Sequence, residues 1–263
     1  MNELLKRTLS GALYVVVLVS AILISEYSFL GLFFVFGLVG LYELQKLLKL
    51  NSYLNYIVLL AALIFFGILK IDTYSIWLLL IITLFVKILL IKDLLIIHKI
   101  PIFEGKKYIL TLFYLISSIL FLTLIPYENG EYSPYILIGI FFLVWFNDSF
   151  AYLVGKNFGK HKLYERISPN KTVEGFLGGL VFCIAASFGV AYFTKTLDFS
   201  TWIIIAILTS VFGTFGDLIQ SKLKRQAKVK DSGTIMPGHG GLLDRLDSIL
   251  FAGTFIYAYL LII

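Results

Sequence analysis

The sequence predicts an all-α polytopic membrane protein with about nine transmembrane helices, an N-terminus in the cytoplasm and a C-terminus outside. Three observations support this prediction: the composition, the length of the apolar stretches and the placement of the cations. Of the 263 residues, 59% are hydrophobic and 14% are charged, and the mean hydropathy is +0.93. Soluble domains carry about 25% charged residues. The composition therefore excludes an ordinary soluble enzyme.

Nine apolar stretches are long enough to cross a hydrocarbon core of ~30 Å, which takes about 20 helical residues. They cover residues 9–24, 29–44, 53–69, 74–91, 108–125, 134–155, 175–194, 201–220 and 246–263. The first two are short and are joined by only four polar residues. They are expected either as two tilted spans or as a miscount of the helices.

Lysine and arginine positions set the predicted orientation, because cytoplasmic connections carry an excess of these residues. The N-terminus and the even-numbered connections, with the adjoining helix ends, hold 20 of the 22. The odd-numbered connections hold only Lys70 and Lys195. We therefore expect a multi-pass protein of the inner or plasma membrane. Because the cations lie in the cytoplasmic connections, we attribute the net charge of +6 to membrane orientation and phosphate binding. No nucleic-acid partner is expected.

Two regions are expected along the chain. Residues 1–130 are predicted to be a scaffold of transmembrane helices and a candidate for oligomer contacts. Residues 131–263 are predicted to be a catalytic transmembrane region with cytoplasmic loops at 156–174 and 221–245. The single cysteine, Cys183, lies inside an apolar stretch, which excludes an intrachain disulfide and a cysteine-based metal site.

Aspartates lie at the cytoplasmic ends of the predicted spans. Asp217 is near the end of the eighth span, and Asp244 and Asp247 begin the ninth, where a spacing of three puts them on one helix face. Asp148 lies about two turns inside the sixth span, or about 10 Å below the surface. A carboxylate in such a position costs roughly 2.5–3.5 kcal/mol. These residues are therefore expected to face water, a metal or a charged partner.

Magnesium fits this group of carboxylates, because Mg²⁺ prefers oxygen ligands and often joins carboxylates to substrate phosphates. We expect Asp217 and Asp244 as ligands, with Asp148 and Asp247 as further candidates. Alternatives remain for the last two. Asp148 could form a structural pair with Asn147 or a lysine, and Asp247 could orient a neighbouring arginine or cap the ninth helix.

A second polar segment precedes the seventh span. Residues 168–174 resemble a helix start with Glu174 in the first turn, where backbone N–H groups could meet an anion. Gly175 and Gly179 form a GxxxG pattern, which favours close helix packing over ligand binding.

Residues 221–247 resemble the signature of the phosphatidate cytidylyltransferase (CDP-diacylglycerol synthase) family. The matching positions are Ser221-x-Leu223-Lys224-Arg225, Lys230-Asp231-x-Gly233 and Pro237-x-His239-Gly240-Gly241-Leu242-x-Asp244-Arg245-Leu246-Asp247. Upstream, Asn147-Asp148-x-x-Ala151-Tyr152 and Ser168-Pro169-x-Lys171-Thr172-x-Glu174-Gly175 are also similar to that family. Met236 is the one departure, an apolar exchange.

The resemblance implies transfer of CMP from CTP to phosphatidic acid, which gives CDP-diacylglycerol and pyrophosphate for phospholipid synthesis. It implies Mg²⁺, with a second monovalent or divalent cation as an option, and a homodimer among membrane lipids. The implied catalytic residues are Asp217, Asp244, Lys224, Arg225, His239 and Arg245. The implied phosphate-binding residues are Ser168, Lys171, Ser221, Lys230, Gly240 and Gly241. How the cations divide between CTP and the lipid stays open.

Two rival classes are weighed against this interpretation. One is a related CTP-using membrane enzyme, either a polyprenol-type lipid kinase or a cytidylyltransferase for another lipid phosphate. The other is an ion-coupled transporter, which predicts polar residues at the midplane of paired, broken helices. The first five spans show no such residues at their centres, and the polar cluster is one-sided, so the enzyme is favoured.

Overall fold

The structure is a computed structural model that describes residues 3–69, 73–128, 130–238 and 240–263. Within these residues the chain forms nine continuous helical segments, in agreement with the predicted all-α class. The first five are α1 (Glu3–Ile24), α2 (Glu26–Leu48), α3 (Leu54–Ala62) continued by the π-helical η1 (Leu63–Ile68), α4 (Thr73–Ile96), and α5 (Glu104–Ile109) continued through η2 (Leu110–Ile116) into α6 (Ser117–Leu124). The last four are α7 (Pro134–Phe158), α8 (Val173–Thr194), α9 (Phe199–Gln226) and α10 (Leu243–Leu260).

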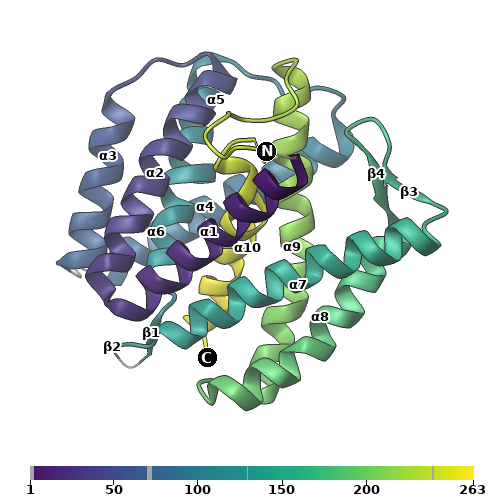
Figure 1. Cartoon of the computed structure of the whole chain (residues 1–263). Coiled ribbons are helices and arrows are strands. Elements are labelled where there is room, and N and C mark those ends of the chain that lie inside the picture. Colours follow the sequence, from purple (N-terminus) through teal and green to yellow (C-terminus); the bar gives the residue numbers. More distant parts are fainter. Residues whose placement is uncertain (1–2, 70–72, 129, 239) are drawn as a thin grey trace.

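Two short antiparallel hairpins join the helices. The first pairs β1 (Tyr127–Glu128) with β2 (Glu131–Tyr132), and the second pairs β3 (Lys162–Tyr164) with β4 (Ser168–Thr172). In the second hairpin Lys162 stands opposite Thr172, and the register shifts between Lys162 and Tyr164. The β3–β4 hairpin projects from the end of α7, away from the helical body (Figure 1).

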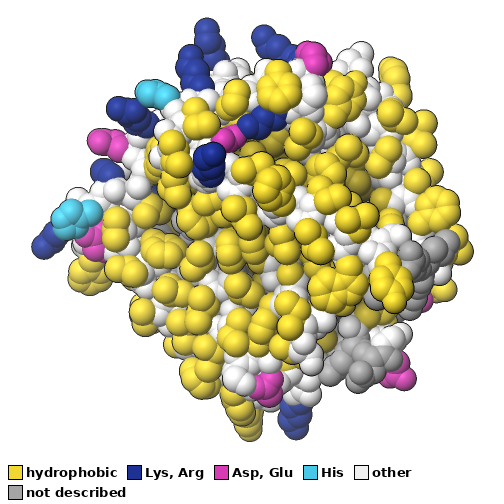
Figure 2. All heavy atoms as spheres, turned by 180° about the vertical axis from the view of Figure 1, so that it is seen from behind, with side chains coloured by type: hydrophobic (Ala, Val, Ile, Leu, Met, Phe, Trp, Pro, Cys, Tyr) yellow, Lys and Arg dark blue, Asp and Glu magenta, His cyan; other side chains and the backbone are white. Residues whose placement is uncertain are grey.

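Six helices of the described residues are long and apolar enough to cross a bilayer: α2, α4, the α5–α6 segment, α7, α8 and α9. The apolar parts of α1 and of α3–η1 are shorter. On the face drawn in Figure 2, hydrophobic side chains form a broad belt, and most of the visible lysines and arginines lie toward one end. The prediction of a multi-pass membrane protein is therefore confirmed.

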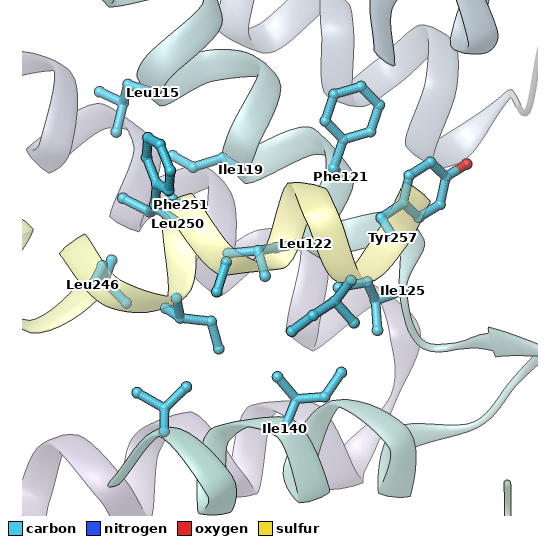
Figure 3. Packing of buried hydrophobic residues seen from close by; sticks show 14 of the residues in the cluster. Leu115, Ile119, Phe121, Leu122, Ile125, Ile140, Leu246, Leu250, Phe251 and Tyr257 are labelled. Carbon is cyan, nitrogen blue, oxygen red and sulfur yellow. The ribbon is translucent and has the colours of Figure 1, made fainter. Parts of the chain in front are cut away.

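Helices α9 and α10 lie at the centre of the molecule (Figure 1). On one side are α7 and α8 with the β3–β4 hairpin, and on the other are α2, α3, α4 and α6, while α1 crosses the front face. The core forms where α10 meets α6 and its neighbours, with Leu122, Leu250 and Phe251 all buried (Figure 3). Since α10 is buried between both halves of the chain, residues at its N-terminus can contact either half.

Helix α7 packs closely on α8 through small residues. A Cβ at Gly179 would lie 3.0 Å from the Ala151 Cβ and 3.0 Å from the Asn147 backbone oxygen. A Cβ at Gly175 would lie 2.7 Å from the Ala151 oxygen. The GxxxG pattern is therefore a packing surface, as expected, and it fixes the part of α7 that carries Asp148.

The two polar connections are shorter than the sequence indicated. Helix α9 continues to Gln226, and α10 begins at Leu243, so the connection covers residues 227–242 in place of the expected 221–245. Likewise α7 ends at Phe158 and α8 begins at Val173, which reduces the expected 156–174 to 159–172. Helix α9 extends beyond its apolar stretch because its polar residues find partners inside the protein: Lys222 binds backbone oxygen at the end of α4, and Lys224 binds Asp244.

Lys87 corrects one step of the orientation argument. It is one of the 20 cations that the sequence assigns to the cytoplasmic connections and adjoining helix ends, but its side chain is fully buried within α4. Its Nζ donates to the Leu250 backbone oxygen at 2.7 Å and to Thr254 Oγ1 at 2.6 Å. Lys87 therefore joins α4 to α10 and does not mark a connection.

Candidate active site

A cavity of about 670 Å³ lies between α7, β4, α8, α9 and α10. Eight of the predicted site residues line it: Asp148, Ser168, Lys171, Asp217, Lys224, Asp244, Arg245 and Asp247. They come from four elements that are up to about one hundred residues apart in the sequence. Helix packing thus assembles one acidic and cationic cavity from the two polar segments.

Asp217 and Lys171 form an ion pair across the cavity. Asp217 comes from α9 and Lys171 from β4, and their side chains are 27% and 30% exposed. Ser221, one helical turn after Asp217, donates its hydroxyl to Asp217 Oδ1 at 3.1 Å. The carboxylate is therefore stabilised by one ammonium group and one hydroxyl, and it still faces the cavity.

Asp244 is held more tightly. Lys224 Nζ lies 2.6 Å from Asp244 Oδ1, and these side chains are only 10% and 6% exposed. Gln220 also donates to Oδ1, at 3.1 Å. The backbone N–H groups of Ser232 and Gly241 donate to Oδ2 at 2.8 and 2.9 Å. Four donors from α9 and the 227–242 connection thus fix this one carboxylate.

Asp148 and Asp247 belong to the acidic lining as well. Asp148 is exposed even though it lies well inside α7, because its side chain faces the cavity. Asn147 Nδ2 approaches Asp148 Oδ1 at 3.4 Å, a weak contact that agrees with the predicted alternative pair. Asp247 is buried, accepts from the backbone N–H of Ser248 at 2.7 Å, and lies within electrostatic range of Asp217 and Asp148.

The remaining predicted residues take different positions. Gly240 and Gly241 lie against Asp244, and Gly240 has a φ of +90° that favours glycine. Arg225 and Lys230 are exposed and are not part of the cavity lining, and the Arg225 guanidinium donates to the Val229 oxygen at 3.1 Å. His239 lies outside the described residues. The structure therefore brings the carboxylates together with Lys171, Lys224 and Arg245, and leaves Arg225 and Lys230 outside.

The expected helix start at 168–174 is only partly correct. Residues Ser168–Thr172 form strand β4, and α8 begins at Val173 with Thr172 as N-cap. The Thr172 hydroxyl accepts from Gly175 N at 3.1 Å. Glu174 accepts from Lys160 N at 3.0 Å and contacts His161 Nδ1 at 2.6 Å. Glu174 thus fastens the hairpin to α8, and the strand presents Lys171 to the cavity.

Residues of the N-terminal region also reach the site, which the sequence did not predict. The Glu43 carboxylate of α2 accepts hydrogen bonds from the Ser232 hydroxyl in the 227–242 connection and from the Leu243 backbone N–H at the start of α10. Tyr14 and Tyr114 lie within electrostatic range of Asp247, and their buried hydroxyls have no hydrogen-bond partner among the described residues. The signal for Glu43 was a lone acidic residue near the end of an apolar stretch, a position that is costly without a partner.

The side chains that line the cavity include oxygen ligands suited to Mg²⁺, but within the described residues they are not already arranged at metal-ligand distances. No group of three or more His, Cys, Asp or Glu side chains stands at metal-ligand spacing in the described parts of the chain. Carboxylates nevertheless gather here, and the buried oxygens Asn147 Oδ1 and Gln220 Oε1 lack partners among the same residues. Such oxygens are the ligands that Mg²⁺ prefers. The donor set therefore fits Mg²⁺.

Comparisons with known proteins identify the family of the chain. A model of the cytidylyltransferase family matches residues 5–263. A protein of Bacillus subtilis named phosphatidate cytidylyltransferase is 36% identical, and the alignment covers 98% of this chain and 97% of that protein. A Staphylococcus aureus protein of the same name is 46% identical over 127 residues, which is 48% of each chain.

Proposed function

The chain belongs to the cytidylyltransferase family, and from that premise we propose that it transfers CMP from CTP to phosphatidate. The products are CDP-diacylglycerol and pyrophosphate. The observation that carries the proposal is the convergence of five aspartates, three lysines and an arginine on one cavity, in a chain that matches a phosphatidate cytidylyltransferase along 98% of its length. The activity is that of a nucleotidyltransferase in phospholipid synthesis.

In the proposed reaction, a phosphate oxygen of phosphatidate attacks the α-phosphorus of CTP. The new oxygen–phosphorus bond forms as the bond to the β-phosphate bridging oxygen breaks, and pyrophosphate leaves. The attacking oxygen is already anionic at neutral pH, so no strong general base is needed. Catalysis then depends on holding the two phosphates in line and on neutralising their charge.

Lysines and an arginine of the cavity provide that neutralisation. Lys171, Lys224 and Arg245 line the same cavity from three elements, so they can contact a triphosphate and a lipid phosphate together. Ser168 also lines the cavity and is a further phosphate donor in this proposal. Gly240 and Gly241 stay predictions for phosphate binding, since the Gly241 N–H already donates to Asp244. Arg225, Lys230 and His239 stay predictions for substrate binding.

Mg²⁺ is proposed as the cofactor, with Asp217 and Asp244 as ligands and Asp148 and Asp247 as further ligands, for one or two cations. When bound, the ion would withdraw charge from the phosphates and lower their mutual repulsion. Support comes from the donor set, since Asp217 and Asp244 already bind ammonium groups in the structure. In this proposal Mg²⁺ would neutralise the same two carboxylates that the lysine ammonium groups neutralise in the structure.

The site is proposed to face the cytoplasm of the inner or plasma membrane. Support comes from the gathering of cations at one end of the molecule, since cytoplasmic faces carry the excess of Lys and Arg (Figure 2). CTP is present on that side. Cysteine labelling of intact cells, with single cysteines placed in the 227–242 connection and in the 195–198 connection, tests this orientation.

Homodimerisation, which the sequence resemblance implied, is proposed as well. It rests on that resemblance, and residues 1–130 are the candidate contact region. Native mass spectrometry of the protein in lipid nanodiscs tests it, because a monomeric mass would contradict the proposal.

Radiolabelled CTP provides the decisive test of the reaction. Purified protein with phosphatidate and Mg²⁺ should transfer label to lipid from α-³²P CTP and should release pyrophosphate. An Asp244→Asn variant should do both about 10²- to 10³-fold more slowly. The rival lipid kinase would label lipid only from γ-³²P CTP, and a transporter would label no lipid.

A further inference from the structure

We propose that Glu43 of α2 is a positioning residue for Asp244, which it controls through the 227–242 connection. This inference rests on the proposed function and extends it to a residue from the opposite half of the chain. Glu43 is 1% exposed and does not line the cavity, so it contacts neither substrate. Its effect must therefore reach the site through the residues it binds.

Three donors bind the Glu43 carboxylate. The Leu242 backbone N–H donates to Oε1 at 3.1 Å, and the Leu243 backbone N–H donates to Oε2 at 2.8 Å. The Ser232 hydroxyl donates to Oε2 at 2.9 Å. Two of these donors are at the start of α10, where no side chain of the helix itself provides a cap. Glu43 therefore replaces a local N-cap with one from α2.

Ser232 connects the two carboxylates. Its hydroxyl binds Glu43, while its own backbone N–H binds Asp244 Oδ2 at 2.8 Å. The adjacent residues Gly241 and Leu242 also bind one carboxylate each: the Gly241 N–H donates to Asp244, and the Leu242 N–H donates to Glu43. Each end of the 232–242 segment is thus held between Glu43 on one side and Asp244 on the other.

Glycines allow this close approach. A Cβ at Gly233 would lie 2.3 Å from Glu43 Oε1, and a Cβ at Gly241 would lie 2.5 Å from Glu43 Oε2. A side chain at either position would require the Glu43 carboxylate to shift. The two glycines therefore let the backbone close around the Glu43 carboxylate, and the same closure directs Gly241 N–H at Asp244.

Loss of the Glu43 acceptor should therefore loosen both backbone donors of Asp244. In a Glu43→Gln variant the amide keeps one acceptor oxygen but turns an N–H₂ group toward donors. Partners that orient metal ligands typically change metal affinity or activity by about 10- to 100-fold when they are mutated. We expect the Mg²⁺ concentration for half-maximal activity to rise by about that factor.

Gln45 provides the matched control. It is also buried and lies two residues away on α2, but its side chain binds Ser52 N at 2.9 Å and Ser52 O at 3.2 Å, away from the connection. A Gln45→Ala variant should lower the melting temperature without changing the Mg²⁺ dependence. A Glu43→Asp variant keeps the charge but shortens the reach, so it should fall between Glu43→Gln and the wild type.

Limited trypsin digestion of the full-length protein in detergent gives a readout independent of catalysis. Lys228 and Lys230 are exposed in the connection. Cleavage there should be several-fold faster in Glu43→Gln and unchanged in Gln45→Ala. Unchanged cleavage and unchanged Mg²⁺ dependence in Glu43→Gln would overturn the proposal, as would equal changes in Gln45→Ala. If the wild type makes no CDP-diacylglycerol but the cleavage difference is present, the proposed function fails and the positioning role stands.

Discussion

The two polar connections of the C-terminal region contribute to one cavity but are held in different ways. The β3–β4 hairpin brings Lys171 to Asp217 through a pair in which both side chains are about 30% exposed. The 227–242 connection is fixed by the buried carboxylates Asp244 and Glu43, which together accept bonds from its two ends. The difference indicates that the side of the site formed by the 227–242 connection is rigid, whereas the side formed by the β3–β4 hairpin is adjustable.

This contrast has a physical basis. Exposed ion pairs contribute little to stability, about 0–1 kcal/mol, because water and salt screen them. Removing one partner of a buried pair costs about 3–5 kcal/mol, because the other charge is left unpaired. Mutations on the rigid side should therefore change both stability and activity, whereas mutations on the hairpin should change activity alone.

Asp244→Asn should give the largest effect. The variant leaves Lys224 buried opposite a neutral amide, and it replaces one carboxylate oxygen with a donor that faces N–H groups. We expect turnover to fall by about 10²- to 10³-fold, as when a preorganised electrostatic group is removed. The unfolding free energy should also fall by about 3–5 kcal/mol. Pyrophosphate release and thermal unfolding in detergent measure the two effects. A loss of activity at unchanged stability would contradict the claim that the 227–242 connection forms a rigid side of the site.

Lys171→Gln should separate activity from stability. The variant removes a cation from the cavity but breaks only a partly exposed pair, so the melting temperature should change little. The specificity constant kcat/KM for CTP or phosphatidate should fall by about 10- to 100-fold, the equivalent of one hydrogen bond to a charged group. Steady-state kinetics with each substrate varied in turn would also assign Lys171 to one of them. A strongly destabilised variant would show that the hairpin is as rigid as the connection.

Gly179→Ala tests the helix pair that carries the hairpin. The added methyl would lie 3.0 Å from Ala151 and Asn147, so we expect overpacking that costs about 1–3 kcal/mol. Gly189→Ala on the same helix is the control, because a methyl added there would have no neighbouring side chain within 4 Å. It should be neutral or stabilising by up to about 1 kcal/mol. Equal melting temperatures for the two variants would argue against close α7–α8 packing.

Glu174→Gln should give the smallest effect. It weakens the contacts that fasten the hairpin through Lys160 and His161, at a site where His161 is 79% exposed. Activity should fall by less than about fivefold, because the contact is screened by water. Kinetics at low and high salt would test this, since the difference from wild type should shrink as salt rises. A hundredfold loss would place the hairpin among the rigid parts of the site.

Much of the fold could be predicted from hydropathy, because a bilayer requires long apolar helices and the sequence shows them. The helix ends could not be predicted as well. Helix α9 continues past its apolar stretch to Gln226, since Lys224 can fold back to Asp244 and Lys222 can bind backbone oxygens at the end of α4. These long-range contacts have no local sequence signal.

The candidate site could be predicted where it contains carboxylates inside or at the ends of membrane spans, because such positions are energetically unfavourable without a partner. Asp148, Asp217, Asp244 and Asp247 stood out as carboxylates at or inside spans, and all four line one cavity. Glu43 is also a carboxylate near the end of a span, but its role could not be predicted, since its partners lie about 190–200 residues further along the chain. The burial of Lys87 could not be predicted either, because its partners on α10 are equally remote in the sequence.

The pairing of Glu43 with Leu243 across 200 residues also has a consequence for biogenesis. Chains grow at roughly 5–20 residues per second, so α2 is made about 10–40 s before the start of α10. During that interval the Glu43 carboxylate has to be accommodated in the membrane without its final donors. Early insertion of this protein therefore depends on water, lipid headgroups or the insertion machinery to solvate one side chain until the last helix arrives.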